Sequence, residues 1–354
     1  MKLNVALIFG GCSSEHEVSV KSATTIITNM SQEKYNVLPI YITKKGEWLL
    51  YEGPRQCDLK NIQWDKLAVN CLINYDRKNK GILRIVGESI STIPIDVIFP
   101  VLHGLNGEDG SLQGIFELAN IPYVGCNIIS SAMSFDKAIT KIVVDTLNIK
   151  QAKYLEFTAE VLSNLEDAYK EIKEKIGYPC FIKPCNEGSS VGISKCKNKK
   201  EVLDGLAEAF KYDFKIVVEK GIKGREVECA ILGDGLENTQ ASCIGEILTS
   251  ETFYDYDAKY NNPESETIVP ADISEELSEE IRESALKIFK KLGCSGLSRV
   301  DFFIETKTDN IIFNEINTLP GFTSISMYPM LWAESGIKTD ELIDELINLA
   351  VGEN

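Results

Sequence analysis

Histidine is scarce in this chain, and its cysteines are not spaced as metal ligands. The 354 residues include only two histidines, His16 and His103, and the ten cysteines form no C-x-x-C pair. Structural zinc sites usually combine ligands of these two types at short spacing, so no zinc centre is expected. Because the cysteines are scattered and mostly stand in apolar segments, we expect reduced, packed thiols in a cytoplasmic protein.

Positive charge is in deficit, since 37 lysines and arginines face 53 aspartates and glutamates, which gives a formal net charge of −16. Nucleic acid and anionic membranes bind proteins through a large basic surface. A net charge of this sign argues against such a surface, so neither partner is expected. No apolar run is long enough to span a bilayer, and the apolar stretch of MKLNVALIFGG is too short for a signal peptide and predicts a first strand instead. Apolar residues make up 44% of the chain, enough for a core in two or three domains.

Strand and helix patterns alternate through roughly the first half of the chain. We expect strands at Leu3–Phe9, Val37–Ile42 and Ile95–Leu102, and helices at Val18–Met30 and Leu112–Ala119. This alternation is typical of an α/β fold with a mainly parallel sheet.

Further elements are expected beyond residue 125. The helices expected there are Ser130–Leu147, Val161–Ile176, Lys200–Phe210, Ser274–Lys291 and Thr339–Val351. The strands are Pro179–Pro184, Lys215–Glu219, Val227–Leu232 and Ile244–Leu248. Boundaries near 125 and 220 then give an N-terminal α/β domain (1–125), a central domain (126–220) and a C-terminal domain (221–354).

The first cluster that could carry chemistry is GGCSSEHE, residues 10–17. Two glycines after a strand allow a tight turn and a close approach by a ligand. Ser14 and Glu17 also have the spacing of a capping box, so a plain capped helix start is an equally good interpretation. In the functional interpretation, Glu15 or Glu17 faces a bound ammonium group. The G-x-G-x-x-G pattern of dinucleotide-binding folds is absent.

The second cluster, HGLNGEDG at residues 103–110, again follows an apolar strand. Its three glycines predict a flexible loop at the carboxyl end of that strand, where α/β folds usually bind ligands. His103 has either a structural role there or a role in the site.

The third cluster is KPCNEGSSVG, residues 183–192, in which a lysine ends a strand and small residues follow. Backbone N–H groups of such a loop can surround phosphate oxygens, with Lys183 as a point charge. The alternative is an ordinary hairpin turn. The Gly-Lys-Ser/Thr pattern of P-loop proteins is missing.

The fourth cluster, FYDYDAKY at residues 253–260, lies in a long stretch without regular periodicity, 250–270. Long loops in compact domains often act as lids over a site. The alternative is a surface loop packed by its own tyrosines.

The fifth cluster consists of two strand-like segments, RVDFF at 299–303 and FNEINTLPG at 313–321. Side chains two apart on a strand share a face. If the hairpin between the segments is symmetric about Thr308, Asp301 lies opposite Glu315 and Arg299 lies opposite Asn317.

That register would gather two carboxylates and an amide oxygen on one face. Two close carboxylates repel each other unless a cation joins them, and a few oxygen ligands suit Mg²⁺ that is shared with phosphates. A structural ion pair of Asp301 with Arg299 is the alternative.

These clusters together resemble the D-alanine–D-alanine ligases of the ATP-grasp superfamily. The resemblance covers nearly the whole chain and rests on GGCSSEHEVS, HGLNGEDG, KPCNEGSSVG, YDYDAKY, SRVDFF and FNEINTLPGFTS in that order. It implies an α/β ATP-grasp fold of three domains, in which antiparallel sheets of the central and C-terminal domains sandwich ATP. It also implies an ADP-forming ligase of peptidoglycan precursor synthesis that is a cytoplasmic homodimer and takes D-alanine and ATP as substrates.

The same resemblance implies roles for individual residues. For the first D-alanine it implies Glu15 at the ammonium group, linked through Ser189 and Tyr260 to the lid, and His103 nearby. For ATP it implies Lys137, Lys183 and Lys259 at the phosphates, Glu219, Lys220 and Ile222 at the adenine, and Glu226 at the ribose. For two Mg²⁺ ions, which Mn²⁺ can replace, it implies Asp301, Glu315 and Asn317. For the oxyanion it implies Arg299 and the backbone N–H of Gly321, and for the carboxylate of the second substrate Ser326 and Met327.

One position departs from the family pattern, because Ile325 stands where the family often has a histidine. Ligases that form D-alanyl-D-serine share the same layout, but the Ala258-Lys259-Tyr260 segment resembles the lid of the D-alanine enzymes. We therefore expect D-alanine as the second substrate. D-serine or D-lactate as second substrate, another ATP-grasp carboxylate–amine ligase, and a non-catalytic nucleotide-binding protein are the alternatives.

Overall fold

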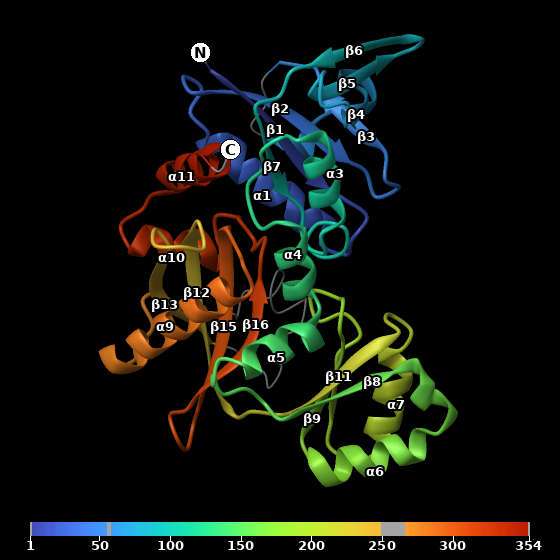
Figure 1. The fold of residues 1–354 in the computed structure, drawn as a ribbon, viewed down its shortest axis with the longest axis vertical. Helices are drawn as coiled ribbons and strands as arrows, with labels where there is room; N and C mark the ends of the chain where they lie inside the picture. The colour runs from blue at the N-terminus through green and yellow to red at the C-terminus, as the bar shows by residue number, and fades with distance from the viewer. Residues whose placement is uncertain (1, 55–57, 249–265, 353–354) are drawn as a thin grey trace.

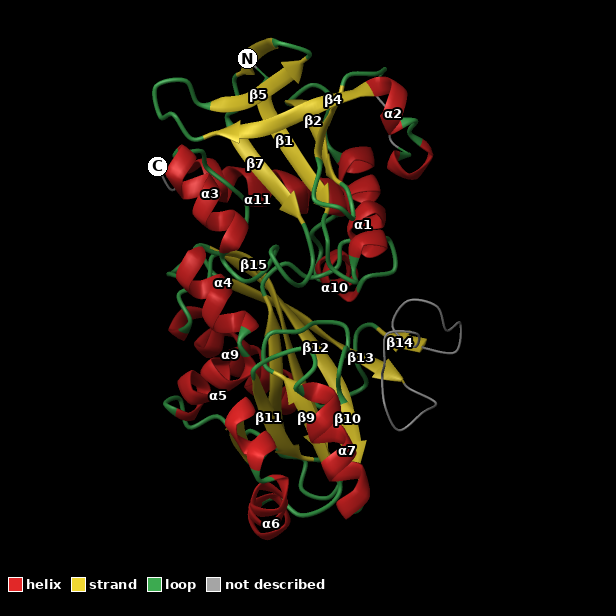
Figure 2. Ribbon diagram, turned by 90° about the vertical axis from the view of Figure 1, so that its right-hand side faces the viewer, coloured by secondary structure: helices red, strands yellow, loops and turns green. Residues whose placement is uncertain are grey.

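Three β-sheets organise the computed structural model, which describes residues 2–54, 58–248 and 266–352. Figure 1 shows one sheet at the top and the other two below it, with both ends of the chain at the top. Figure 2 shows helices packed along the sides of these sheets.

The N-terminal sheet has seven described strands in the order β6-β5-β4-β3-β2-β1-β7. Their bounds are β1 Leu3–Gly10, β2 Tyr35–Ile42, β3 Trp48–Tyr51, β4 Ala68–Asn74, β5 Gly81–Val86, β6 Ser89–Ile93 and β7 Val97–Val101. Strand β1 pairs in parallel with β2 and β7. Its residues from Val5 to Gly10 are buried, because α1 (His16–Asn29) packs on one face and α3 (Ser111–Ala119) on the other. The loop that follows the carboxyl end of β1, residues 11–15, lies toward the middle of the molecule.

The α/β class is confirmed, but the sheet is parallel only around β1. Strands β3 to β6 extend it with antiparallel pairs. None of these four strands was among those expected from the sequence. The exposure of β6 (Ser89–Ile93) accounts for that strand alone, because almost all of its residues face solvent. Two short helical segments, η1 (Leu59–Asn61) and α2 (Trp64–Leu67), connect β3 to β4.

The expected helix Ser130–Leu147 is in fact two helices, α4 (Ile128–Phe135) and α5 (Lys137–Asp145). Asp136 separates them, because its Oδ1 accepts hydrogen bonds from the backbone N–H groups of Ala138 and Ile139, each over 3.1 Å. An aspartate in this position satisfies N–H groups that have no partner within the helix. The break makes Lys137 the first residue of α5. The helix expected at Val161–Ile176 is likewise divided, into η2 (Ala159–Ser163) and α6 (Leu165–Lys175).

The central sheet is antiparallel, in the order β10-β9-β11-β8. Its strands are β8 (Tyr154–Thr158), β9 (Cys180–Pro184), β10 (Ser194–Cys196) and β11 (Lys215–Lys220). Helices α6 and α7 (Lys199–Ala209) pack on it around a core of its own, which contains Ile172, Ile182 and Leu206. Strands β9 and β10 pair directly as a hairpin. The loop that contains Gly188, Ser189 and Ser190, called the Gly-Ser-Ser loop below, projects from the end of this hairpin.

The C-terminal sheet is also antiparallel, in the order β14-β13-β12-β15-β16. Its strands are β12 (Gly224–Gly233), β13 (Gln240–Leu248), β14 (Glu266–Ile268), β15 (Gly296–Glu305) and β16 (Ile311–Asn317). Helix α9 (Glu275–Lys291) packs on one face through Ile281, Ala285 and Ile288. Ser274 caps its start by accepting the N–H of Leu277.

Two further helices join the C-terminal sheet to the N-terminal sheet. Helices α10 (Met327–Glu334) and α11 (Thr339–Gly352) share one core with β1, α1 and β7. Leu342 and Leu346 of α11 are fully buried in it. Asp344 also accepts hydrogen bonds from Lys34 Nζ over 2.5 Å and from Tyr35 Oη over 2.7 Å. Figure 1 shows α11, in red, beside the blue helix α1.

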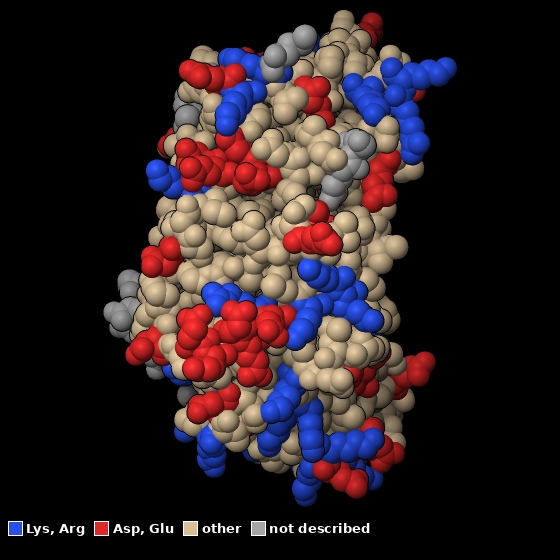
Figure 3. Space-filling model, turned by 60° about the vertical axis from the view of Figure 1, so that its left-hand side comes forward, with Lys and Arg blue, Asp and Glu red and all other residues tan. Residues whose placement is uncertain are grey.

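Acidic and basic side chains are interspersed on the face drawn in Figure 3. That face therefore offers no continuous basic surface of the kind that nucleic acid selects. Among the helices of the described residues, none is at once long and apolar enough to cross a membrane.

Candidate active site

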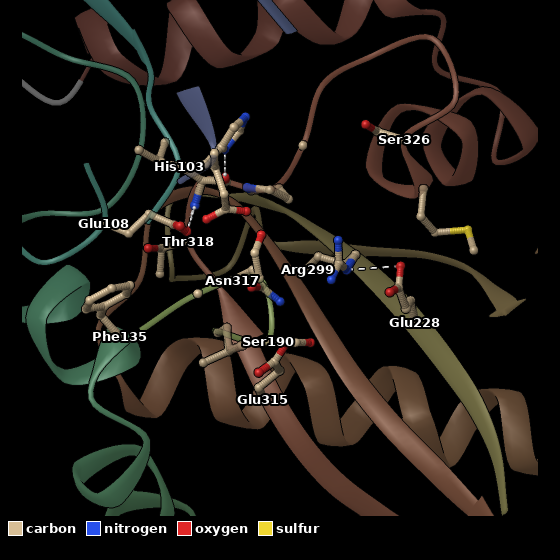
Figure 4. Close-up of a pocket in the computed structure, with 18 of the residues that line it drawn as sticks. His103, Glu108, Phe135, Ser190, Glu228, Arg299, Glu315, Asn317, Thr318 and Ser326 are labelled. Carbon is tan, nitrogen blue, oxygen red and sulfur yellow. Dashed lines mark hydrogen bonds and ion pairs between the residues drawn. The ribbon is translucent and has the colours of Figure 1, made fainter. Parts of the chain in front are cut away.

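A cavity of about 160 Å³ lies where loops of the N-terminal sheet meet β15, β16 and the Gly-Ser-Ser loop. Figure 4 shows side chains from these segments directed toward one another. The residues of the sequence prediction that line it are Glu15, His103, Lys137, Ser189, Arg299, Glu315, Asn317, Gly321, Ser326 and Met327. Residues more than 300 positions apart in the sequence thus form one site.

The predicted register of β15 and β16 is confirmed. Asp301 pairs with Glu315 and Arg299 pairs with Asn317, while a bulge after Asp301 shifts the pairing by one residue from Phe302 onward. Asn317 Nδ2 donates a hydrogen bond to Asp301 Oδ2 over 3.1 Å. On the opposite face of the sheet, Phe302 packs in the core beneath α9. This packing fixes the position of β15, the strand that carries Asp301.

These three side chains fit a divalent cation that is shared with another ligand. In the part of the chain that the structure describes, no three His, Cys, Asp or Glu residues cluster as metal ligands. Two carboxylates and one amide oxygen supply only part of a coordination shell, as is usual for Mg²⁺ that completes its shell with phosphates and water. Asp301 keeps lone pairs for such a role even while it pairs with Arg299, because a carboxylate has about four acceptor positions.

Arg299 connects β15 to β12. It donates to Asp301 from Nε over 2.8 Å and from Nη2 over 2.7 Å, and its Nε lies 3.0 Å from Glu228 Oε2. Figure 4 shows the contact between Arg299 and Glu228. Burial works against the charged guanidinium, but Asp301 and Glu228 hold the pKa of Arg299 well above its usual range. A fixed, permanent positive charge therefore faces the cavity.

Glu228 was not among the predicted site residues, although it lines the cavity and is only 3% exposed. It lies opposite Asp301 on β12. The signal in the sequence was a single acidic residue inside the otherwise apolar strand Val227–Leu232, because buried charges need partners.

Glu15 reaches the cavity between two glycines. A Cβ atom at Gly104 would lie 2.9 Å from Glu15 Oε2, and one at Gly188 would lie 2.7 Å from the same oxygen. The two glycines thus leave room for the Glu15 carboxylate, and the positive φ of 72° at Gly104 favours glycine there in addition. The alternative interpretation of this cluster as a capping box is wrong, because Glu15 occupies the N-cap position without a side-chain cap and Glu17 pairs with Lys44 over 2.8 Å.

Both ring nitrogens of His103 have partners within the protein, so neither is available to a ligand in the cavity. Its Nδ1 lies 2.8 Å from the carbonyl oxygen of Leu319, and its Nε2 lies 3.2 Å from Ser22 Oγ. The same Ser22 Oγ accepts the backbone N–H of Phe322 over 3.1 Å. Burial lowers the pKa of His103, which favours the neutral ring. His103 and Ser22 therefore hold the backbone on both sides of Gly321.

Glu108 is a second site residue that the sequence prediction missed, although it stands in the HGLNGEDG motif. Its Oε2 accepts the N–H of Gly104 over 2.8 Å, and its Oε1 accepts the N–H of Leu319 over 2.9 Å. Burial, with the neighbouring charge of Glu15, raises the pKa of Glu108 to about 8.

Two of the predicted phosphate lysines approach the Gly-Ser-Ser loop and β16. Lys137 Nζ donates to the carbonyl oxygen of Glu187 over 2.6 Å. Lys183 Nζ lies 2.8 Å from Glu219 Oε2 and 3.4 Å from Asn314 Oδ1 on β16. Lys183 therefore bridges the central and C-terminal sheets.

The Gly-Ser-Ser loop has an unusual backbone. Ser189 and Ser190 have positive φ angles of 46° and 62°, which residues with a side chain adopt rarely. Among the described residues, Ser189 Oγ has no hydrogen-bond partner. Strain of this kind is concentrated at ligand-binding loops.

Asp301 and Lys183 are not among the residues that line the cavity, and the other predicted residues lie outside it or outside the described residues. Glu219 is buried between Lys183 and Lys141, Lys220 Nζ donates to the carbonyl oxygen of Tyr178 over 2.7 Å, and Ile222 and Glu226 flank the start of β12. Lys259 and Tyr260, with most of the expected lid, lie in 249–265, outside the described residues.

The second-substrate residues Ser326 and Met327 begin α10. Ser326 Oγ accepts the N–H of Thr323 over 3.0 Å and bonds to its hydroxyl over 2.8 Å. A Cβ atom at Gly321 would lie 2.9 Å from Ser326 Oγ, so glycine is needed where this loop closes on α10.

Comparison with known proteins gives one consistent result. Residues 4–126 match the family model "D-ala D-ala ligase N-terminus", and residues 143–348 match "D-ala D-ala ligase C-terminus". D-alanine–D-alanine ligases of Caldicellulosiruptor bescii and Acetivibrio thermocellus are 47% and 49% identical, over 100% and 99% of this chain and 96% of each relative.

Solved structures agree with this comparison. The VanG D-Ala:D-Ser ligase of Enterococcus faecalis superposes with a TM-score of 0.89 at 42% identity, covering 99% of this chain and all of that one. The D-alanine–D-alanine ligase of Coxiella burnetii superposes with a TM-score of 0.85 at 34% identity, covering 99% of this chain and 94% of that one. With these two family models spanning nearly its whole length, the chain belongs to the D-alanine–D-alanine ligase family.

Proposed function

We propose that the protein joins two D-alanine molecules to D-alanyl-D-alanine with the consumption of ATP, through a D-alanyl phosphate intermediate. The observation that carries the proposal is the pairing of Asp301 with Glu315 and of Arg299 with Asn317 on adjacent strands. This arrangement sets acidic oxygen donors and a fixed cation at the edge of one cavity, as the transfer of a phosphoryl group to a carboxylate requires.

In the first step, an oxygen of the first D-alanine carboxylate attacks the γ-phosphorus of ATP, and the bond from that phosphorus to the bridging oxygen of ADP breaks. Lys137 and Lys183 neutralise phosphate charge, and Glu15 holds the substrate ammonium group. Transfer of this kind depends on positioning and charge stabilisation more than on covalent help from the protein.

In the second step, the neutral amino nitrogen of the second D-alanine attacks the acyl-phosphate carbonyl carbon. The bond from that carbon to the phosphate oxygen breaks, and inorganic phosphate leaves with the proton that the nitrogen loses. Arg299 and the backbone N–H of Gly321 stabilise the oxyanion that forms on the carbonyl oxygen. One donor of this type lowers the barrier by roughly 3 kcal/mol. Ser326 and Met327 receive the carboxylate of the second substrate.

The metal requirement is part of the proposal. Asp301, Glu315 and Asn317 would hold two Mg²⁺ ions, or Mn²⁺ in their place, together with the ATP phosphates. The ions supply charge neutralisation on the phosphoryl group. The chain's own part is to keep the three side chains on one face, which the β15–β16 register does.

We propose D-alanine rather than D-serine as the second substrate, even though a D-Ala:D-Ser ligase is among the similar structures. The relatives at 47% to 49% identity are named D-alanine–D-alanine ligases. The Ala-Lys-Tyr segment at 258–260 supports the same choice. Cytoplasmic peptidoglycan precursor synthesis, a homodimeric state and the domain division 1–125, 126–220 and 221–354 belong to the proposal as well.

The decisive experiment measures phosphate release with ATP and Mg²⁺ in the presence of D-alanine, D-serine or D-lactate, and identifies the product by mass spectrometry. We expect ADP formation that depends on D-alanine, with D-alanyl-D-alanine as the main product. A dominant D-alanyl-D-serine product would overturn the choice of second substrate, and ATP turnover independent of any D-amino acid would overturn the ligase proposal.

A further inference from the structure

Lys141 is a buried cation outside the cavity. It follows Lys137 by one turn of α5, but its side chain is only 2% exposed. Its Nζ lies 3.1 Å from Glu219 Oε1 and 5.4 Å from the centre of the Tyr154 ring. Burying an ammonium group costs free energy unless a partner compensates it, and a leucine would serve the packing of an amphipathic helix better. The position of Lys141 therefore calls for an electrostatic explanation.

Glu219 connects Lys141 to Lys183. One carboxylate oxygen faces Lys141, and the other lies 2.8 Å from Lys183 Nζ. Burial alone would raise the pKa of Glu219, but the two lysines lower it to about 2. Burial lowers the pKa of Lys141, and Glu219 opposes this shift. With all three side chains ionised, Glu219 is an anion between two cations and the cluster carries one net positive charge.

We propose that Lys141 is a positioning residue that neutralises Glu219 and so leaves the charge of Lys183 for the phosphates of ATP. Without Lys141, Glu219 and Lys183 would form a neutral buried pair, and phosphate oxygens would compete with a carboxylate for the same ammonium group. With Lys141 present, Lys183 can turn from Glu219 to a phosphate without leaving a buried carboxylate uncompensated. The inference rests on the proposed function, which gives Lys183 a phosphate to bind.

A purely structural role of the ion pair makes a different prediction. If Lys141 only stabilised the junction of α5 and β11, its removal would lower the melting temperature and leave the binding of ATP unchanged. The charge account instead predicts that ATP binding weakens, and that the loss of Lys141 has no such effect once the charge of Glu219 has been removed.

The test compares initial rates over a range of ATP concentrations, at saturating D-alanine, for Lys141→Met, Lys141→Arg and the double variant Lys141→Met/Glu219→Gln. We expect Lys141→Met to raise the KM for ATP about tenfold or more, because Lys183 could then bind phosphate only by leaving the buried carboxylate of Glu219 without a partner, which is strongly unfavourable. The KM for D-alanine should stay unchanged. Lys141→Arg keeps the charge and should bind ATP like the wild type. Because Glu219 is itself expected at the adenine, Glu219→Gln alone is the reference for the double variant, and adding Lys141→Met to it should not raise the KM further.

Lys175→Met is the matched control, because Lys175 also pairs with a glutamate, Glu171 over 2.6 Å, but on the exposed surface of α6. It removes the same charge without touching the cluster, so its KM for ATP should equal that of the wild type. Melting temperatures of all variants separate a change in stability from a change in binding.

Two outcomes would overturn the inference: a wild-type KM for ATP in Lys141→Met, or a Lys141→Met change that raises the KM as much in the Glu219→Gln background as in the wild type. Should Lys141→Met fail to fold, the double variant is compared with Glu219→Gln, and a KM about tenfold higher in the double variant would overturn the inference. Lys183→Met separates the two proposals. If it leaves the KM for ATP unchanged, the phosphate role of Lys183 is wrong; if it raises that KM while Lys141→Met does not, only the role of Lys141 is wrong.

Discussion

The backbone N–H of Leu319 donates a hydrogen bond to Glu108 Oε1 over 2.9 Å. A side chain of the N-terminal loop thereby holds the segment that follows β16. His103 binds the carbonyl oxygen of the same Leu319, and Ser22 binds the N–H of Phe322. The backbone of Gly321 is thus fixed from both sides by residues that lie more than 200 positions earlier in the sequence.

Glu108→Gln should reduce kcat roughly tenfold or more while leaving the KM for ATP unchanged. Both carboxyl oxygens can accept whether or not Glu108 carries its proton, but the amide nitrogen of glutamine cannot. Either Gly104 or Leu319 therefore loses its buried acceptor, which costs about 1–3 kcal/mol. Displacing Gly321 then weakens the stabilisation of the oxyanion. Steady-state kinetics test this, with Glu117→Gln on the exposed face of α3 as control. A Glu108→Gln variant with wild-type kcat would contradict the positioning role.

The pH dependence of stability should also change in Glu108→Gln. The folded protein holds the Glu108 proton up to a pKa of about 8, whereas the unfolded chain releases it near pH 4.3. Between these values the folded state binds more protons, so this group makes the wild type less stable as the pH rises. The free energy of unfolding of the wild type minus that of the variant should therefore be larger at pH 5 than at pH 8.5. Urea unfolding at both values measures it, and an equal difference at the two would refute the assignment.

Glu315→Gln should lower the rate of D-alanyl-D-alanine formation by roughly a hundredfold or more, since loss of an oxygen ligand weakens a metal site at least as much as loss of a supporting residue does. The melting temperature should change little, because Glu315 stands at the cavity rather than in the core. Glu305→Gln, at the far end of β15, is the matched control and should keep wild-type activity. Near-normal turnover in Glu315→Gln would exclude it as a metal ligand.

Asp136→Ala should lower the free energy of unfolding by about 2 kcal/mol, because it removes the cap of α5. It also removes the ion-pair partner of Lys215. Asp136→Asn retains a capping oxygen but not the charge, so its stability should be intermediate. Urea unfolding followed by circular dichroism compares the three proteins. Equal stability of the alanine variant and the wild type would show that the break between α4 and α5 has another cause.

The β15–β16 pairing was predictable because strand geometry leaves few choices. Side chains alternate with a period of two, and a short turn about Thr308 allows one symmetric register, which places Asp301 opposite Glu315. The bulge beyond Asp301 was not predictable, since its position depends on how Phe302 and Phe313 fit beneath α9. Local rules thus located the carboxylates but not the exact course of the strands around them.

The missed residues share a different property. Glu108, Glu228 and Lys141 are charged side chains whose partners, Leu319, Arg299 and Glu219, lie 71 to 211 positions away. Only the folded chain brings each pair together. A local pattern can therefore signal that Glu228 is buried in an apolar strand, but not which residue it pairs with. Helix α10 (Met327–Glu334) was missed for a related reason. Most of its faces are buried, with Pro329 in its first turn, so it lacks the periodicity of an amphipathic helix.

The packing of α11 against α1 and β1 has a consequence for how the protein is made. The N-terminal core remains open during synthesis until residues near Leu346 have left the ribosome, because those side chains complete it. Contacts over more than 300 residues slow folding and leave apolar surface exposed in the nascent chain. The N-terminal core is therefore expected to finish folding last, although most of its residues are translated first.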